Sequence, residues 1–130
     1  MTDQQWEVFF KACARLLGPG TSKQANSDSW CAWTTFDSLA DSVHYWSAGL
    51  PSEEFLATDH IRDSGPWGQP FLYSSVAHIV LPRDFYWEYA SESQFTNDTK
   101  HQDLDTLSLE LLRLDIPHRI TPLVLEIKLY

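Results

Sequence analysis

The apolar residues of this chain recur with two different periods, and this mixture restricts the fold class more than any other feature. Near the N-terminus they return every three or four residues, whereas from Leu123 onward they occupy every second position. The first period is typical of a helix with one buried face, and the second is typical of a strand. We therefore expect an α+β domain in which helices pack on a sheet.

Two segments, about 3–17 and 100–114, are predicted to be long amphipathic helices. Each begins with a threonine followed three residues later by a glutamine, which is the spacing of a capping box. These pairs are Thr2 with Gln5 and Thr99 with Gln102. Apolar side chains then mark one face of each helix, at Trp6, Phe9, Phe10, Cys13, Leu16 and Leu17 and at Leu104, Leu107, Leu111 and Leu114.

The sheet is expected to be mostly antiparallel, because its predicted strands are short and separated by turn residues. The C-terminal strand is predicted at about 123–130, and the others at 30–36, 43–46, 76–81 and 85–90. Residues 91–98 are predicted to be a polar loop. The state of residues 30–62 stays open between strand and helix, since aromatic residues there recur at near-helical spacing and Pro51 suits a helix start.

Length and composition favour one globular domain over residues 1–130. Hydrophobic residues make up 43% and charged residues 21% of the 130 positions, close to the globular average. No apolar run approaches the roughly 20 residues that cross a bilayer, and the polar N-terminus does not resemble a secretory signal. We expect a cytoplasmic protein without a membrane partner. Two cysteines, Cys13 and Cys31, are too few for a disulfide framework, and whether they are bridged stays open.

The balance of charge is strongly acidic. Eighteen acidic and nine basic residues give a formal net charge of -9 at pH 7. Such a charge repels phosphate backbones, so nucleic acid is not an expected partner. Two readings of the acidity remain: it keeps the protein dispersed in solution, or it steers the protein toward a basic partner.

One pattern points to catalysis. Glu126 and Lys128 are separated by one residue on the predicted C-terminal strand, so their side chains project to the same side. The acid-x-Lys pattern resembles the last element of the restriction-endonuclease-like nucleases, in which an earlier acid, here Asp84 or Asp115, completes a metal site. The resemblance covers three residues. The alternative is an outer strand face on which an acid and a base screen each other.

No other motif predicts a cofactor, a metal or a nucleophile. The five histidines are scattered without the spacing of a local metal site. Neither cysteine has a local cue for a reactive thiolate, and no nucleophile elbow or phosphate-binding loop is present. His118, near the end of the second predicted helix, and His78 are the remaining polar candidates for a site assembled from distant residues.

Aromatic residues are more abundant than a core of this size requires. They make up 14% of the chain, and adjacent aromatic residues on one strand cannot all face the same core. We expect some of them to face outward beside an acidic residue and to form a binding surface. The candidate interface residues are Trp46, Trp67, Tyr86, Trp87, Tyr89 and Glu88. Their complete burial is the alternative.

The function hypothesis is a small acidic cytoplasmic protein-binding module, of the kind that an immunity-type protein represents when it neutralises a basic partner. Acidic complementarity speeds the encounter with such a partner, and buried aromatic residues slow its release. The alternative is an enzyme or small-ligand-binding protein, with Glu126, Lys128 and His118 as candidate catalytic residues and without a predicted cofactor. A homodimer is a third possibility.

Overall fold

The computed structural model describes all 130 residues. Along the chain the elements are α1 (Asp3–Leu17), η1 (Gln24–Asn26), β1 (Cys31–Thr35), α2 (Phe36–Asp41), β2 (Trp46–Ala48), η2 (Glu53–Phe55), β3 (His60–Ile61), β4 (Phe71–Leu72), η3 (Tyr73–Ser75), β5 (Val76–Pro82), β6 (Asp84–Ala90), β7 (Phe95–His101), α3 (Leu104–Arg113), β8 (Arg119–Ile120) and β9 (Val124–Lys128). The elements η1 to η3 are single 3₁₀ turns.

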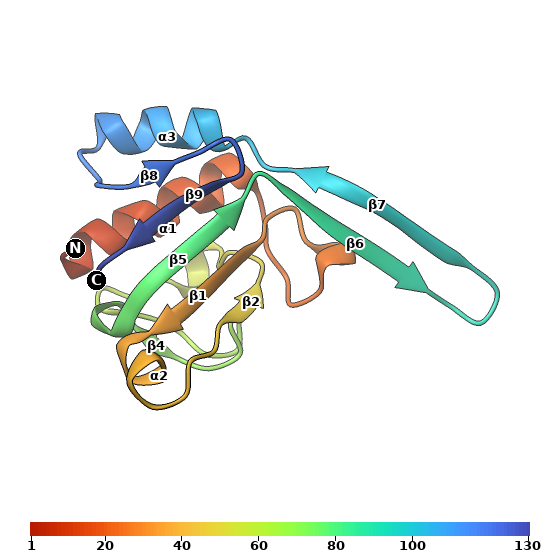
Figure 1. The fold of residues 1–130 in the computed structure, drawn as a ribbon, viewed down its shortest axis with the longest axis horizontal. Coiled ribbons are helices and arrows are strands. Elements are labelled where there is room, and N and C mark those ends of the chain that lie inside the picture. The colour runs from red at the N-terminus through yellow and green to blue at the C-terminus, as the bar shows by residue number, and fades with distance from the viewer.

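A five-stranded sheet in the order β2-β1-β5-β9-β8 forms the body of the molecule (Figure 1). Each neighbouring pair in this sheet is antiparallel. Helices α1 and α3 contact each other and contribute to the same hydrophobic cluster as β5 and β9. The expectation of an α+β fold with a mostly antiparallel sheet is therefore confirmed.

Helix α1 begins and ends where the sequence predicts. Its first turn is closed by the capping box, in which the Gln5 amide donates to Thr2 Oγ1 at 3.1 Å and the Thr2 amide donates to Gln5 Oε1 at 2.8 Å. Gly18 follows the last turn with a φ of +91°, a conformation that glycine adopts without strain.

The second predicted helix is shorter than expected, and its predicted cap is wrong. Helix α3 starts at Leu104, because Asp103 is the N-cap and accepts a hydrogen bond from the Thr106 amide at 3.1 Å. Residues up to His101 instead pair with another strand as part of β7. Gln102, assigned to a capping box by its spacing from Thr99, is buried, and its side-chain amide donates to Trp30 O and Pro82 O.

The central segment and the predicted polar loop also differ from expectation. A strand does occupy Cys31–Thr35, but the following residues form α2, whose N-cap Thr35 accepts from the Ser38 amide at 3.1 Å. The helix expected after Pro51 is reduced to the single turn η2. Residues 95–98, predicted as part of a loop, lie in β7. Both faces of β7 are exposed, so this strand has no apolar alternation that a sequence would display.

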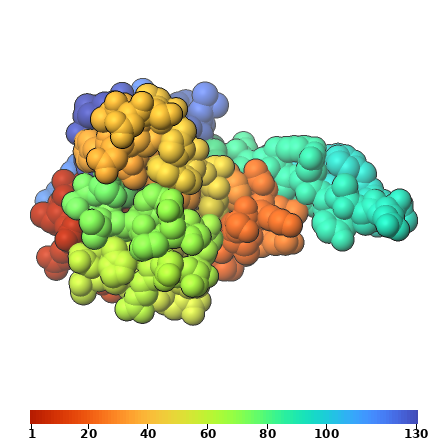
Figure 2. Space-filling view, turned by 90° about the horizontal axis from the view of Figure 1, so that it is seen from below, coloured from red at the N-terminus to blue at the C-terminus, as the bar shows by residue number.

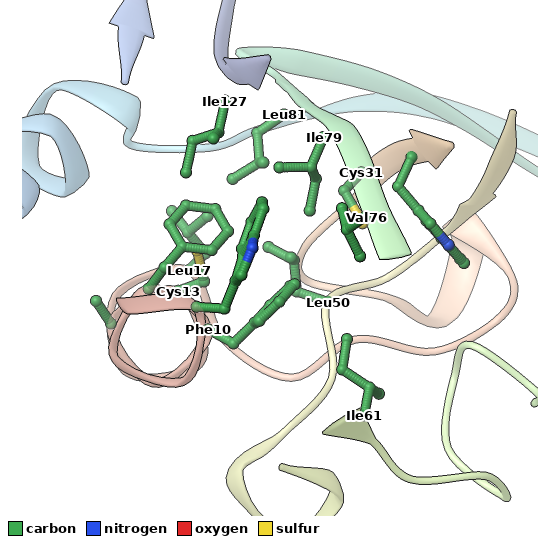
Figure 3. Packing of buried hydrophobic residues seen from close by; sticks show 14 of the residues in the cluster. Phe10, Cys13, Leu17, Cys31, Leu50, Ile61, Val76, Ile79, Leu81 and Ile127 are labelled. Atoms are coloured by element: carbon green, nitrogen blue, oxygen red, sulfur yellow. The ribbon is translucent and has the colours of Figure 1, made fainter. Parts of the chain in front are cut away.

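Aromatic side chains fill much of the core. Trp67 stacks on Trp33 with ring centroids 3.6 Å apart, and Phe71 meets both rings edge-on. Side chains of α1 and of the strands face one another across this cluster in Figure 3, where Phe10, Cys13, Leu17, Ile79, Leu81 and Ile127 are labelled. The core of the body thus contains much of the aromatic content of the chain.

Both cysteines are buried as free thiols, so no bridge joins Cys13 to Cys31. Burial raises the pKa of each thiol well above its ordinary value, which keeps both protonated near neutral pH. No helix of the structure has the length and apolar character that crossing a membrane requires.

A close approach of two backbone segments fixes the loop that carries η1. The Gly49 amide donates to Thr21 O at 2.8 Å, and the Thr21 amide donates to Ser27 Oγ at 2.9 Å. A Cβ atom on Gly49 would overlap Ser27 Oγ and the backbone of Gly20. This contact therefore requires glycine.

We predict that Gly49→Ala lowers the free energy of unfolding by about 3 kcal/mol, because the overlap forces the loop away from β2. Gly68→Ala is the matched control: Gly68 has a φ of +77° but open space around it. It should cost about 1 kcal/mol, the strain of a left-handed alanine. Urea unfolding of both variants measures the difference, and equal losses would contradict the close-approach explanation.

Candidate functional site

Strands β6 and β7 form a two-stranded hairpin that leaves the body, and we call residues 84–101 the arm. The hairpin is a separate sheet with no third strand. Figures 1 and 2 show it projecting well beyond the rest of the molecule. It follows β5 almost directly, since β5 ends at Pro82 and β6 begins at Asp84.

The register of the arm sorts its side chains onto two faces. Phe85, Trp87 and Tyr89 lie on one face, and Tyr86 and Glu88 lie on the other. Burial falls with distance from the body: Phe85 is buried, Trp87 is half-buried and Tyr89 is exposed. The exposed fractions of Tyr86, Tyr89 and Phe95 are 53%, 57% and 57%. Both faces of the outer arm thus present aromatic rings to solvent.

A buried side-chain amide fixes the base of the arm. Gln102 Oε1 accepts from the Trp30 amide at 3.0 Å, and Gln102 Nε2 donates to Trp30 O at 3.0 Å and to Pro82 O at 2.8 Å. The Trp30 ring stacks on Phe85 with centroids 6.0 Å apart. The direction in which the arm leaves the body is set by these contacts.

The single lysine of the arm is bound internally. Lys100 Nζ donates to three backbone carbonyls of the preceding loop, at Gln24 (3.3 Å), Ala25 (3.1 Å) and Ser27 (2.8 Å). The same ammonium lies 5.6 Å from the centre of the Trp87 ring. These contacts hold η1 against the arm and engage the only Lys or Arg between residues 84 and 101.

The charge that the arm presents to solvent is consequently acidic. Its four acidic residues are Asp84, Glu88, Glu92 and Asp98, all exposed. Glu88 accepts a hydrogen bond from Tyr86 Oη at 3.0 Å, which joins an acidic group to an exposed ring. Depressions of about 310 and 190 Å³ lie between residues 23–26 of the loop and residues 86–90 of β6.

The structure brings together four of the six predicted interface residues. Tyr86, Trp87, Glu88 and Tyr89 are consecutive on β6. Trp67 is only 5% exposed and its indole donates to Gly49 O at 3.2 Å, so the expectation that it faces outward is wrong. Trp46 is half-buried and stacks on Trp33. Aromatic packing in the core holds both tryptophans away from the arm.

Phe95 is an exposed arm residue that sequence reasoning missed. It follows the turn at residues 91–94 and lies opposite Ala90. The only signal in the sequence is a lone phenylalanine within a polar stretch, which does not by itself indicate a strand. Its pairing with an aromatic strand becomes visible only in the structure.

A second candidate site is a chain of hydrogen-bonded side chains on the sheet face opposite the helices. Tyr45 Oη lies 2.8 Å from His78 Nδ1, and His78 Nε2 lies 2.8 Å from Glu126 Oε2. Arg119 Nη1 donates to Glu126 Oε1 at 3.0 Å. We call these four residues the polar chain. The side chains of His78 and Glu126 are only 12% and 16% exposed.

The electrostatics of the polar chain favour an ionised Glu126. Hydrogen bonds from His78 and Arg119 lower the pKa of the Glu126 carboxyl below its ordinary value of 4.5. Partial burial, together with Tyr130 and Glu126 nearby, raises the pKa of Tyr45 to about 12. Tyr45 therefore remains a neutral phenol that can donate to His78 at neutral pH.

Of the alternative catalytic residues, Glu126 belongs to the polar chain and Lys128 and His118 lie near it, and the polar atoms of Glu126 and His118 are already hydrogen-bonded. Glu126 and Lys128 do share a strand face, opposite Val80 and His78, and Lys128 Nζ lies 4.7 Å from the centre of the Tyr130 ring. His118 Nε2 is 2.7 Å from Ser108 Oγ and its Nδ1 is 2.9 Å from Ile116 O. A depression of about 310 Å³ is lined by His118, Arg119, Glu126 and Lys128 among others.

The acids suggested by the nuclease-like pattern are placed elsewhere. Asp84 Oδ1 lies 2.8 Å from His101 Nδ1 at the base of the arm, and Asp115 occupies a turn after α3 with a φ of +59°. No three His, Cys, Asp or Glu side chains lie close enough together to hold a metal ion.

Neither a protein-family model, nor a curated protein, nor a solved structure matches this chain.

We predict that Gln102→Leu lowers the free energy of unfolding by about 3 kcal/mol, because it leaves a buried amide and two buried carbonyls without their partner. Gln94→Leu, in the exposed turn of the arm, is the control and should change this free energy by less than about 0.5 kcal/mol. Urea unfolding measures both. Faster amide hydrogen exchange throughout β6 and β7 should accompany the loss at Gln102, and unchanged exchange would contradict its role in holding the arm.

Glu126→Gln should lower the free energy of unfolding by about 1 kcal/mol at pH 7, where the native carboxylate accepts from His78 and Arg119. Because folding lowers the Glu126 pKa, this contribution is present above pH 4.5 and is lost as the pH falls through the folded-state pKa. In unfolding measurements, the difference between the two proteins should shrink as the pH falls below 4.5. A difference that keeps its full size throughout the acid range in which both proteins stay folded would contradict the carboxylate as its source, and Glu92→Gln in the exposed turn is the matched control.

Proposed function

We propose that this protein binds a basic protein partner through the arm. The observation that carries the proposal is the exposure of Tyr86, Tyr89 and Phe95 on a hairpin that projects from the body (Figure 2). Aromatic side chains are the commonest anchors of protein interfaces, since each removes a large area from water and loses little conformational entropy. Three such rings within one short hairpin support a binding role for it.

The arrangement of charge supports a basic partner. The four acidic residues of the arm are exposed, whereas Lys100 is bound to backbone carbonyls. Glu88 and Asp98 lie on opposite faces of the hairpin, so each face joins an acidic group to an aromatic ring. A basic surface would be attracted at long range by the net charge of -9 and then contacted by these rings.

The form of binding that we propose is inhibitory, in a cytoplasmic protein of the immunity type. An acidic hairpin that projects from the body suits the blocking of a cationic site on another protein, because it can enter a concave surface that a flat protein surface cannot enter. Gln102 and Lys100 support this view by fixing the arm in advance, which lowers the entropy lost on binding.

The polar chain supports a second candidate function, the binding or conversion of a small molecule. The depression beside it gathers His118, Arg119, Glu126 and Lys128. Both oxygens of Glu126 and both nitrogens of His118 are, however, already hydrogen-bonded within the protein. Groups that are satisfied internally have less to gain from a ligand, and for this reason we prefer the arm.

An arm variant tests the proposal. Replacing Tyr86, Tyr89 and Phe95 with threonine removes the rings but retains residues that favour strands. The native protein and this variant are each used to capture proteins from an extract of the source cells. The variant should retain at least tenfold less of a basic protein than the native protein does. Its retention by the native protein should also fall as salt rises, since salt screens the attraction.

The matched control changes three exposed leucines outside the arm, Leu109, Leu112 and Leu123, to glutamine; their exposed fractions are 70%, 66% and 77%. This control should retain the basic protein as the native chain does. Equal retention by the arm variant, or loss only in the leucine control, would contradict the arm as the binding surface.

A further inference from the structure

We infer that the partner contributes an extended basic segment that adds as a third strand to the free edge of β7. The inference rests on the proposed function, because it describes how the arm would hold its partner. It commits to one occupant, a strand of another protein that carries Lys or Arg. The argument depends on the hydrogen-bond phase of the hairpin, the neighbours of its two edges and the charge along it.

The phase of the hairpin determines which backbone groups point outward. Ser91 and Gln94 exchange both backbone hydrogen bonds across the turn, at 2.7 and 3.4 Å. Bonded and non-bonded pairs alternate along an antiparallel ladder, so the next bonded pairs are Tyr89 with Thr96 and Trp87 with Asp98. The bond from the Gln102 amide to Arg83 O at 2.7 Å falls in the same phase at the base.

It follows that Phe95, Asn97 and Thr99 direct their amide and carbonyl groups away from β6. The Thr99 amide confirms this direction, because it donates to Asp98 Oδ1 at 2.7 Å and not to β6. The amide and carbonyl groups of these three residues form one edge that pairs with no other strand, although the Thr99 amide is engaged by the Asp98 carboxylate. Such an edge is a template for an added strand.

The two edges of the arm differ in access. Residues 23–26 of the preceding loop lie beside β6 and line depressions with residues 86–90. No third strand pairs with β7, and its outer edge is open in Figure 1. The edge of β7 is therefore the one that an added strand can reach. Because β7 has seven residues, it can pair with a strand of about six residues.

Charge selects a basic strand over a second copy of this chain. Two arms paired edge to edge would bring their acidic residues together, and like charges placed opposite one another destabilise a sheet. The Asp98 carboxylate also accepts a hydrogen bond from the outward Thr99 amide, which hinders unspecific pairing of other strands with β7. A Lys or Arg on the incoming strand would pair with Asp98 and leave the Thr99 amide for the strand's carbonyl.

Proline substitutions test the edge directly. Asn97→Pro removes an outward amide of β7 but no hydrogen bond inside the hairpin, and Ala90→Pro does the same for β6. The probe is the capped peptide Thr-Lys-Val-Arg-Val-Lys-Thr, with a control in which its three basic residues are glutamate. Amide chemical shifts during titration report binding. The basic peptide should move the amides of Phe95, Asn97 and Thr99, and its affinity should fall at least tenfold in Asn97→Pro but not in Ala90→Pro.

A second measurement does not depend on the folding of any variant. Methylating alternate peptide nitrogens removes the amides of one edge of the probe, and an added strand uses only one edge. Only one of the two alternately methylated peptides should lose binding. No binding of the basic peptide, equal binding of the glutamate peptide, equal effects of the two methylation patterns, or loss in Ala90→Pro alone would each overturn strand addition at β7.

The outcomes also separate this inference from the proposed function. If the threonine variant of the arm loses the captured basic protein while Asn97→Pro retains it, the arm binds its partner without adding a strand. Concentration-dependent dimerisation that Asn97→Pro abolishes would overturn the choice of a basic partner in favour of a second copy.

Discussion

The buried side-chain amide of Gln102 forms hydrogen bonds with backbone groups that a neighbouring strand would otherwise bind. It forms hydrogen bonds with the backbone amide and carbonyl of Trp30, the residue before β1, and with the carbonyl of Pro82 at the end of β5. Trp30 in turn stacks on Phe85, the first aromatic residue of the arm. The sheet of the body and the hairpin that leaves it are thereby held in one fixed relation. Without that amide, three buried backbone groups would lack partners at the point where the chain changes from body to arm.

The body and the arm use aromatic residues for different purposes. In the body, Trp33 stacks on Trp67, and its buried Nε1 has no hydrogen-bond partner, a cost that dense packing must offset. On the face of the arm with Phe85, Trp87 and Tyr89, rings become progressively exposed toward the turn. The Lys100 ammonium is held by the loop carbonyls, so the charged groups that the arm exposes are mainly acidic. A stable, aromatic-rich body therefore presents a hairpin that has little core of its own.

Elements with strong local signals were predictable from the sequence. The capping box and apolar stripe of α1 define its bounds, and alternation defines the strand that contains Glu126 and Lys128. Strand β7 was not predictable, since both its faces are solvated and its pairing depends on β6. The start of α3 was misplaced for the same reason: the spacing of Thr99 and Gln102 imitates a cap, but tertiary pairing draws Thr99 into a strand.

The candidate site was predicted in part. Adjacent aromatic residues on one strand cannot all face one core, so exposure of part of the run from Tyr86 to Tyr89 was expected, with complete burial as the alternative. Tyr86 and Tyr89 are exposed and Trp87 is half-buried. Trp67 could not be assigned in the same way, because the loop that carries it folds back onto Trp33. The contact of His78 with Glu126 joins residues 48 positions apart, and it arises from the pairing of β5 with β9. No local pattern in the sequence encodes that pairing.

Photo-crosslinking from single positions tests most directly whether the arm carries the binding. A photoreactive phenylalanine analogue would replace Tyr89 on the arm in one protein and Tyr45 on the polar chain in another, and both would be irradiated in the source cells. A crosslinked basic protein formed from position 89 and not from position 45 is the predicted result. Crosslinks formed from position 45 alone would contradict the account and favour the sheet face as the site of function.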